Sequence, residues 1–108
     1  MPRKVKRKTV RSVLRAARAL IVKHGWIKGH EGNERVGFCA LGAIKHVAAS
    51  LELREAAYRK LTNANHLPNP WIHKVPRRCV WWWNDGRGQT ERQVLAGFAR
   101  AIKKVRSK

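Results

Sequence analysis

The sequence predicts a mostly α-helical protein: a single compact domain of about four helices with a Pro/Trp-rich irregular segment, and with room for a short strand pair. Three observations predict this fold. The 108 residues, 44% of them apolar, suffice for one modest hydrophobic core. Apolar residues recur at helical spacing in four segments. The polar start of the chain cannot join that core, so we expect residues 1–8 to form a flexible basic arm and residues 9–108 the helical domain.

The first helix is expected over residues 10–24, because the apolar residues of this segment fall on one broad face of a helical wheel. Thr9 or Ser12 can cap its start, and Gly25 suits the turn that ends it. A glycine-bearing loop is expected to follow over residues 26–37.

The second helix is expected over residues 38–50, FCALGAIKHVAAS, and Lys45 is its only charged residue. We therefore expect it to be the buried central helix. Gly42 costs about 1 kcal/mol within a helix unless close packing requires it. A kink or short turn at Ser50 should separate this helix from a third one over residues 51–61.

Residues 62–78 contain three prolines and are not expected to form a regular helix. The CVWWW run at 79–83 fits a short strand or an extended segment. Successive side chains would then alternate in direction, so at least one of the rings of Trp81, Trp82 and Trp83 should be partly exposed.

A turn and a final helix complete the prediction. Asn84-Asp85-Gly86 is a turn signal. Thr90 and Gln93 have the spacing of a capping box ahead of an apolar run, which places the last helix at about 91–105.

Charge is distributed very unevenly along the chain. Lys and Arg number 25 and Asp and Glu six, a net charge of +19. Residues 1–28 carry +10, residues 29–70 carry +1 and residues 71–108 carry +8. Positive charge gathered at both ends of the chain indicates a surface for an anionic partner. Such a partner would also offset the self-repulsion by which this charge opposes folding.

Several classes of protein are disfavoured by the sequence. It has no apolar run of membrane-spanning length and no signal-peptide core after its basic start, so we expect no membrane association. Two cysteines are too few for a disulfide scaffold, which favours a cytoplasmic protein. No phosphate-binding, dinucleotide-binding or metal-ligand motif is present, so no cofactor is expected.

Basic residues near tryptophans predict nucleic-acid binding through phosphate contacts, with base stacking on exposed rings. DNA and RNA fit equally well, as would another polyanion. The first helix contributes an arginine stripe at spacings of four and three residues. The expected contact residues are Arg3, Lys4, Lys6, Arg7, Lys8, Arg11, Arg15, Arg18, Arg77, Arg78, Trp81, Trp82, Arg87, Arg100 and Lys103.

Cys39, at the expected start of a helix, is the one candidate nucleophile. His46 lies on the same helical face, but seven residues at a rise of 1.5 Å place it roughly 10 Å away, too far to act as a base. We therefore interpret Cys39 as a small core residue and do not expect an enzyme.

Three motifs in order resemble a family of small uncharacterised bacterial and phage proteins, a domain of unknown function. These motifs are Gly25-Trp26, the CALGAI segment at 39–44, and Trp83-Asn84-Asp85 before the last helix. The resemblance covers roughly residues 10–105 and implies a compact helical domain of bacterial or phage origin. It implies no activity.

Asn84 and Asp85 have two interpretations. They can serve as turn and cap residues, or they can line a pocket with Trp26 and Cys39 near the start of the second helix. The second interpretation belongs to an alternative function, a non-enzymatic phage accessory protein that binds a host factor or sequesters an anionic nucleotide.

Overall fold

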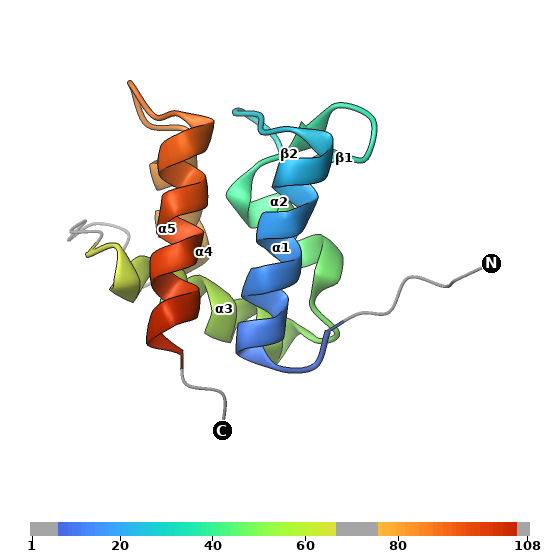
Figure 1. The fold of residues 1–108 in the computed structure, drawn as a ribbon, viewed down its shortest axis with the longest axis vertical. Helices are drawn as coiled ribbons and strands as arrows, with labels where there is room; N and C mark the ends of the chain where they lie inside the picture. The colour runs from blue at the N-terminus through green and yellow to red at the C-terminus, as the bar shows by residue number, and fades with distance from the viewer. Residues whose placement is uncertain (1–6, 67–75, 106–108) are drawn as a thin grey trace.

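The computed structural model describes residues 7–66 and 76–105. These residues form five helices and a two-stranded antiparallel sheet, so the predicted mostly helical domain is confirmed (Figure 1). In chain order the elements are α1 (Val10–His24), β1 (Gly32–Asn33), β2 (Gly37–Phe38), α2 (Ala40–Val47), α3 (Leu51–Ala64), α4 (Pro76–Asn84) and α5 (Glu91–Lys104).

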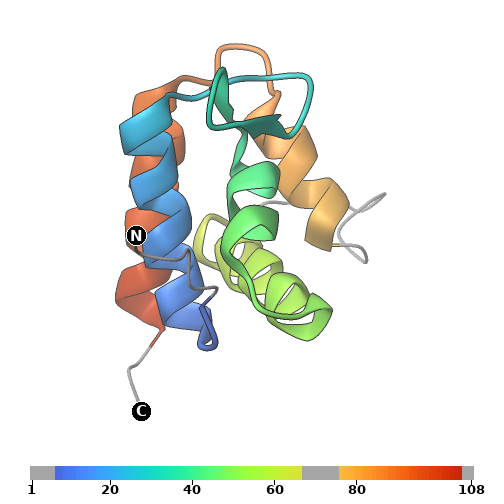
Figure 2. The same cartoon turned by 90° about the vertical axis from the view of Figure 1, so that its right-hand side faces the viewer.

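Helices α1 and α5 lie side by side and run in opposite directions (Figure 1). Helix α2 packs against α1 on one side and α4 on the other (Figure 2). Helix α3 contacts all four of the other helices. The core between them consists of fully buried side chains such as Leu14, Ile44, Leu61 and Phe98.

Local capping sets the ends of α1 and α5 where the sequence predicts them. The Thr9 side chain accepts a hydrogen bond from the Ser12 amide at 3.2 Å, and Gly25 ends α1 with a φ of 101°. Thr90 and Gln93 form the expected capping box at the start of α5.

Helix α2 is shorter than predicted but is buried as expected. It begins at Ala40 rather than residue 38, because Phe38 pairs in β2 and Cys39 is the N-cap. Gly42 has the close packing that its cost in a helix requires. A Cβ at this position would collide with the backbone carbonyl of Glu31, whose carbonyl carbon would lie only 2.7 Å away.

The prediction of a strand or extended segment for the CVWWW run at 79–83 is wrong. The run belongs to helix α4. Helix α3 begins after Ser50, its predicted turn and N-cap, but ends at Ala64 rather than at residue 61. Proline has no backbone N–H, but the N–H groups in the first turn of a helix have no acceptor within that helix. Pro76 is therefore tolerated as the first residue of α4. Helix α4 has one buried face and one exposed face. Cys79, Val80 and Asn84 are buried, whereas Trp81 and Trp82 are exposed. Residues 67–75 lie outside the described residues.

The short strand pair that the sequence allowed forms in the glycine-bearing loop. Gly32 pairs with Phe38 and Asn33 with Gly37. The backbone of Gly32 and Gly37 adopts left-handed φ values of 89° and 105°, which glycine adopts without strain.

The structure describes the basic arm only from Arg7 onwards. The Arg7 amide donates to Val47 O at 2.7 Å, and its carbonyl accepts from the Ala49 amide at 3.0 Å. These bonds fix Arg7 beside the α2–α3 junction; Arg3, Lys4 and Lys6 lie outside the described residues. Within the described ranges, no helix combines the length and apolarity needed to cross a membrane.

Candidate nucleic-acid interface and neighbouring cavity

Asn84 is the centre of a buried hydrogen-bond hub. Its side chain is fully buried, and its Oδ1 accepts from Trp26 Nε1 at 2.6 Å and from the Ala40 amide at 2.9 Å. Its Nδ2 donates to Ile27 O and to Asp85 Oδ1, both at 3.0 Å. The side-chain amide thus uses both donors and accepts two hydrogen bonds.

The hub joins three segments that are distant in sequence. Asp85 Oδ1 also accepts from the Gly29 amide at 3.1 Å, and Lys28 Nζ donates to Gly86 O at 2.9 Å. These bonds fasten the loop after α1 and the start of α2 to the end of α4. The predicted pocket residues do come together at this hub: Trp26, Cys39, Asn84 and Asp85. However, none of them lines either of two cavities in the described part of the chain, of about 650 and 880 Å³. Their contacts support the structural interpretation.

Cys39 has the surroundings of a core residue. It is 1% exposed, and its Sγ accepts from the Gly42 amide at 3.2 Å. Burial raises the pKa of the Cys39 thiol, and this effect outweighs the opposing hydrogen bond from Gly42. His46 instead packs its ring against Phe38 at a centroid distance of 5.1 Å.

We expect Cys39 to resist alkylation in the folded protein. A buried thiol with a raised pKa supplies little thiolate at neutral pH. Iodoacetamide at pH 7, followed by peptide mass analysis, should label Cys39 slowly in the native state and rapidly after unfolding in urea. Equal rates in the two states would indicate an accessible thiolate and contradict the assignment of Cys39 to the core.

A groove along the first half of α1 gathers cations from three parts of the chain. It encloses about 880 Å³, and its cationic lining residues are Arg7, Arg11, Arg15 and Lys60. Lys60 comes from α3, and Val105, just after α5, also lines the cavity. Among the described residues, no carboxylate lines this cavity. We call it the basic groove.

The three arginines of the predicted stripe have different roles. Arg11 and Arg15 line the basic groove, and Arg15 is exposed. Arg11 Nε is buried without a hydrogen-bond partner among the described residues. Arg18 is half-buried and lines neither cavity; its Nε donates to Leu95 O at 3.1 Å and thereby ties α1 to α5.

The layer formed by α1 and α5 is almost free of acidic residues. Of the six carboxylates in the chain, only Glu91 belongs to either helix. Arg100 and Lys103 are exposed on α5, although Arg100 Nε donates to Asn65 Oδ1 at 2.9 Å. Since opposing charges are scarce on these two helices, the positive potential of the layer is largely unopposed.

A second set of predicted contact residues lies on α4. Arg77, Arg78, Trp81 and Trp82 are all exposed, and the two rings are 48% and 60% exposed. Exposure of at least one ring was expected. Trp83, like Trp26, packs against the core. Helix α4 lies across α2 from α1, so the structure keeps this set apart from the basic groove (Figure 2). The exposed Arg87 follows in the turn after α4.

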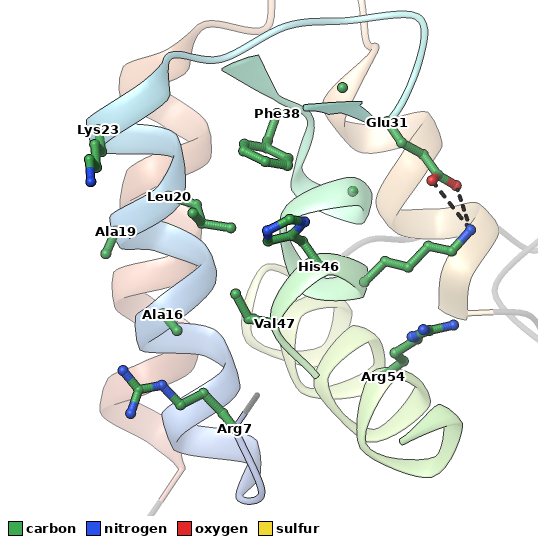
Figure 3. A pocket seen from close by; sticks show the side chains of 13 residues that line it. Arg7, Ala16, Ala19, Leu20, Lys23, Glu31, Phe38, His46, Val47 and Arg54 are labelled. Atoms are coloured by element: carbon green, nitrogen blue, oxygen red, sulfur yellow. Dashed lines mark hydrogen bonds and ion pairs between the residues drawn. The ribbon is translucent and has the colours of Figure 1, made fainter. Parts of the chain in front are cut away.

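A neighbouring cavity lies between α1 and α2 and encloses about 650 Å³. We call it the α1–α2 groove. Figure 3 shows Phe38 and His46 at its centre and the Glu31–Lys45 ion pair at its edge. Arg7, Ala16 and Ala19 line both cavities.

Sequence reasoning missed several cations at these grooves. Lys60 was not predicted as a contact, nor were Lys23, Lys45 and Arg54, which line the α1–α2 groove. Lys60 and Arg54 belong to α3, and only the packing of α3 beneath α1 and α2 brings them to the grooves. No local sequence pattern reports that packing.

The described part of the chain contains no cluster of three or more His, Cys, Asp or Glu side chains suited to holding a metal ion. Cys39 and Cys79 are separate buried thiols, and burial raises the pKa of both.

Comparison with known proteins gives a family and no activity. Neither the curated proteins nor the solved structures include a match to this chain. The model of a family of unknown function, DUF6197, matches residues 5–104, nearly the whole chain. This agrees with the resemblance drawn from the sequence motifs. The chain belongs to the DUF6197 family of proteins of unknown function.

Proposed function

We propose that this protein binds nucleic acid through phosphate contacts on its α1–α5 layer, in the cytoplasm of a bacterium or of a phage-infected host. The observation that carries the proposal is the basic groove, where four cations converge and no carboxylate lines the cavity among the described residues. Phosphate contacts of this kind give affinity without reading the base sequence. DNA and RNA are both suitable partners.

The groove is held in place before any ligand arrives. α1 is capped at both ends, and backbone hydrogen bonds fix Arg7. Arg11 Nε is a buried donor that lacks an acceptor among the described residues, and a phosphate oxygen near it would supply one. A preorganised cationic site loses less conformational entropy when it binds.

The exposed face of α4 offers a second kind of contact. Arg77 precedes Trp81 by four residues and Arg78 precedes Trp82 by four, so each arginine neighbours a ring on the helix surface. Unpaired bases stack on exposed indoles, whereas paired bases in a duplex are not available to them. A single strand that passes around α2 would therefore gain contacts that a duplex does not make.

Substituting two arginines of the basic groove tests the proposal. The Arg11→Gln/Arg15→Gln variant should lose about 1.4–1.8 in the slope of log affinity against log salt, at about 0.7–0.9 for each phosphate contact. Affinity at about 0.1 M salt should fall roughly 25- to 60-fold for every base sequence. Fluorescence anisotropy with labelled 20-nucleotide DNA and RNA strands and the corresponding duplexes measures both quantities.

Two comparison variants separate the groove from general charge. Arg35→Gln/Arg59→Gln removes the same charge from exposed residues that line neither cavity, and should change the slope little. Trp81→Ala/Trp82→Ala should cost about 1–3 kcal/mol per stacked base on single strands, with an unchanged slope. If the two arginine pairs have equal effects, the basic groove is not the binding site.

A further inference from the structure

We propose that the α1–α2 groove binds one nucleoside phosphate, with the base against its apolar floor and the phosphate among the cations at its edge. This site is distinct from the basic groove, although the two adjoin. The ligand can be a free mononucleotide or one nucleotide of a bound strand, because both present the same chemistry. The free-nucleotide form of the proposal does not depend on the proposed function.

The size and floor of the groove suit a planar organic group. Its volume of about 650 Å³ lies within the range of small-molecule sites. Leu20, Phe38 and Val47 supply apolar surface, and the His46 and Phe38 rings pack at an interplanar angle of 55° (Figure 3). A base inserted here would contact aliphatic and aromatic side chains, as is common for nucleotide rings.

The charges at the edge of the groove favour an anion. Among the described residues, four cations and one carboxylate line it. Lys45 and Arg54 lie on the same side as the carboxylate of Glu31, and Lys23 and Arg7 lie on the α1 side (Figure 3). Glu31 is already paired with Lys45 at 3.2 Å, and both side chains are nearly half exposed. Such a pair is weak in water, so Lys45 can turn to a phosphate at little cost.

Arg54 adds a donor that lacks a partner. Its Nε is buried and makes no hydrogen bond within the described part of the chain. A buried donor without an acceptor is unfavourable, and an anion in the groove would provide that acceptor. Figure 3 shows the Arg54 side chain on the same side of the groove as Glu31, the ion-pair partner of Lys45.

The walls of the groove are preformed. The Cys39 amide donates to Glu31 O at 3.1 Å, and the lack of a side chain on Gly42 lets the Glu31 backbone lie against α2. At the opposite end, the Arg7 amide donates to Val47 O and the Arg7 carbonyl accepts from the Ala49 amide. The site therefore needs no large rearrangement to accept a ligand.

Titration with four small probes tests the chemistry of the site. AMP should bind the full-length protein and shift the backbone amide signals of Gly32, Gly42 and Lys45 in ¹H–¹⁵N spectra. Adenosine, ribose 5-phosphate and inorganic phosphate should each bind at least tenfold more weakly. If adenosine binds as tightly as AMP, the cations do not recognise phosphate. If inorganic phosphate binds as tightly as AMP, the apolar floor does not recognise a base. Either result overturns the proposal.

Two substitutions of opposite expected sign test the location. Glu31→Gln removes the only carboxylate that lines the groove among the described residues and should tighten AMP binding about two- to fivefold, whereas Lys45→Gln should weaken it by a similar factor. Glu91→Gln changes the net charge as Glu31→Gln does, but on α5, outside the groove, and should leave the AMP affinity unchanged. Equal effects of Glu31→Gln and Glu91→Gln would overturn the assignment to this groove.

A further titration with an oligonucleotide distinguishes a free mononucleotide from a nucleotide of a bound strand as the ligand. If AMP does not bind but a 12-nucleotide strand shifts the same three amides, the ligand is a nucleotide of a bound strand and the proposal stands in that form. If neither probe shifts them, the proposal fails. The Arg11→Gln/Arg15→Gln variant should weaken strand binding while leaving AMP binding unchanged, which separates failure of this site from failure of the basic groove.

Discussion

Replacing Asn84 with alanine is expected to lower the free energy of unfolding by about 3–5 kcal/mol. The substitution would leave the Ala40 amide, the Trp26 indole N–H and the Ile27 carbonyl without their partner. Each polar group left unsatisfied in the interior costs roughly 1–3 kcal/mol. Urea denaturation followed by tryptophan fluorescence measures the change.

An exposed asparagine provides the control. Asn63→Ala, on the surface of α3, should change the free energy of unfolding by less than about 0.5 kcal/mol. Asn84→Asp keeps the acceptor for Trp26 and Ala40 but places a second carboxyl beside Asp85, so it should also destabilise. If Asn84→Ala were as mild as Asn63→Ala, the hub would not hold α2, α4 and the loop together.

The second large effect is expected from Gly42→Ala. The new Cβ would collide with the backbone carbonyl of Glu31, which also accepts the Cys39 amide hydrogen bond. The Cβ is fixed to the backbone of α2 and would meet the backbone of Glu31. Neither backbone can move aside as a flexible side chain would. We expect a loss of about 1–3 kcal/mol in the free energy of unfolding, despite the better helix propensity of alanine.

Gly86→Ala is the comparison for this substitution. Gly86 has no left-handed φ, and the nearest atom to an added Cβ would be Trp83 O at 3.3 Å. A cost below about 1 kcal/mol is expected there. A stabilising Gly42→Ala substitution would show that α2 and the Glu31 backbone are not in close contact in solution.

The parts of the fold that the sequence predicted are those set by local interactions. Thr9, Gly25 and the Thr90–Gln93 box each act within a few residues, so their patterns are visible in the chain. The burial of α2 was likewise predictable from its single charge, Lys45.

The errors arise where tertiary packing decides. The tryptophan run has no clear period, and its helix packs on the core through Val80, Trp83 and Asn84. The sequence indicated Asn84 as a turn or pocket residue, whereas in the packed structure its side chain is the centre of a hydrogen-bond hub. It also brings Lys60 from α3 to the basic groove. A single sequence does not encode such a contact in any local pattern.

The affinity of the unmodified protein for polynucleotides as a function of salt tests the central claim most directly. Four phosphate contacts at Arg7, Arg11, Arg15 and Lys60 predict a slope of about −3 or steeper for log affinity against log salt. Affinities should be similar for strands of unrelated sequence. Anisotropy titrations at several concentrations of sodium chloride give this slope. Undetectable binding of both DNA and RNA at low salt, or binding that salt does not weaken, would contradict the account.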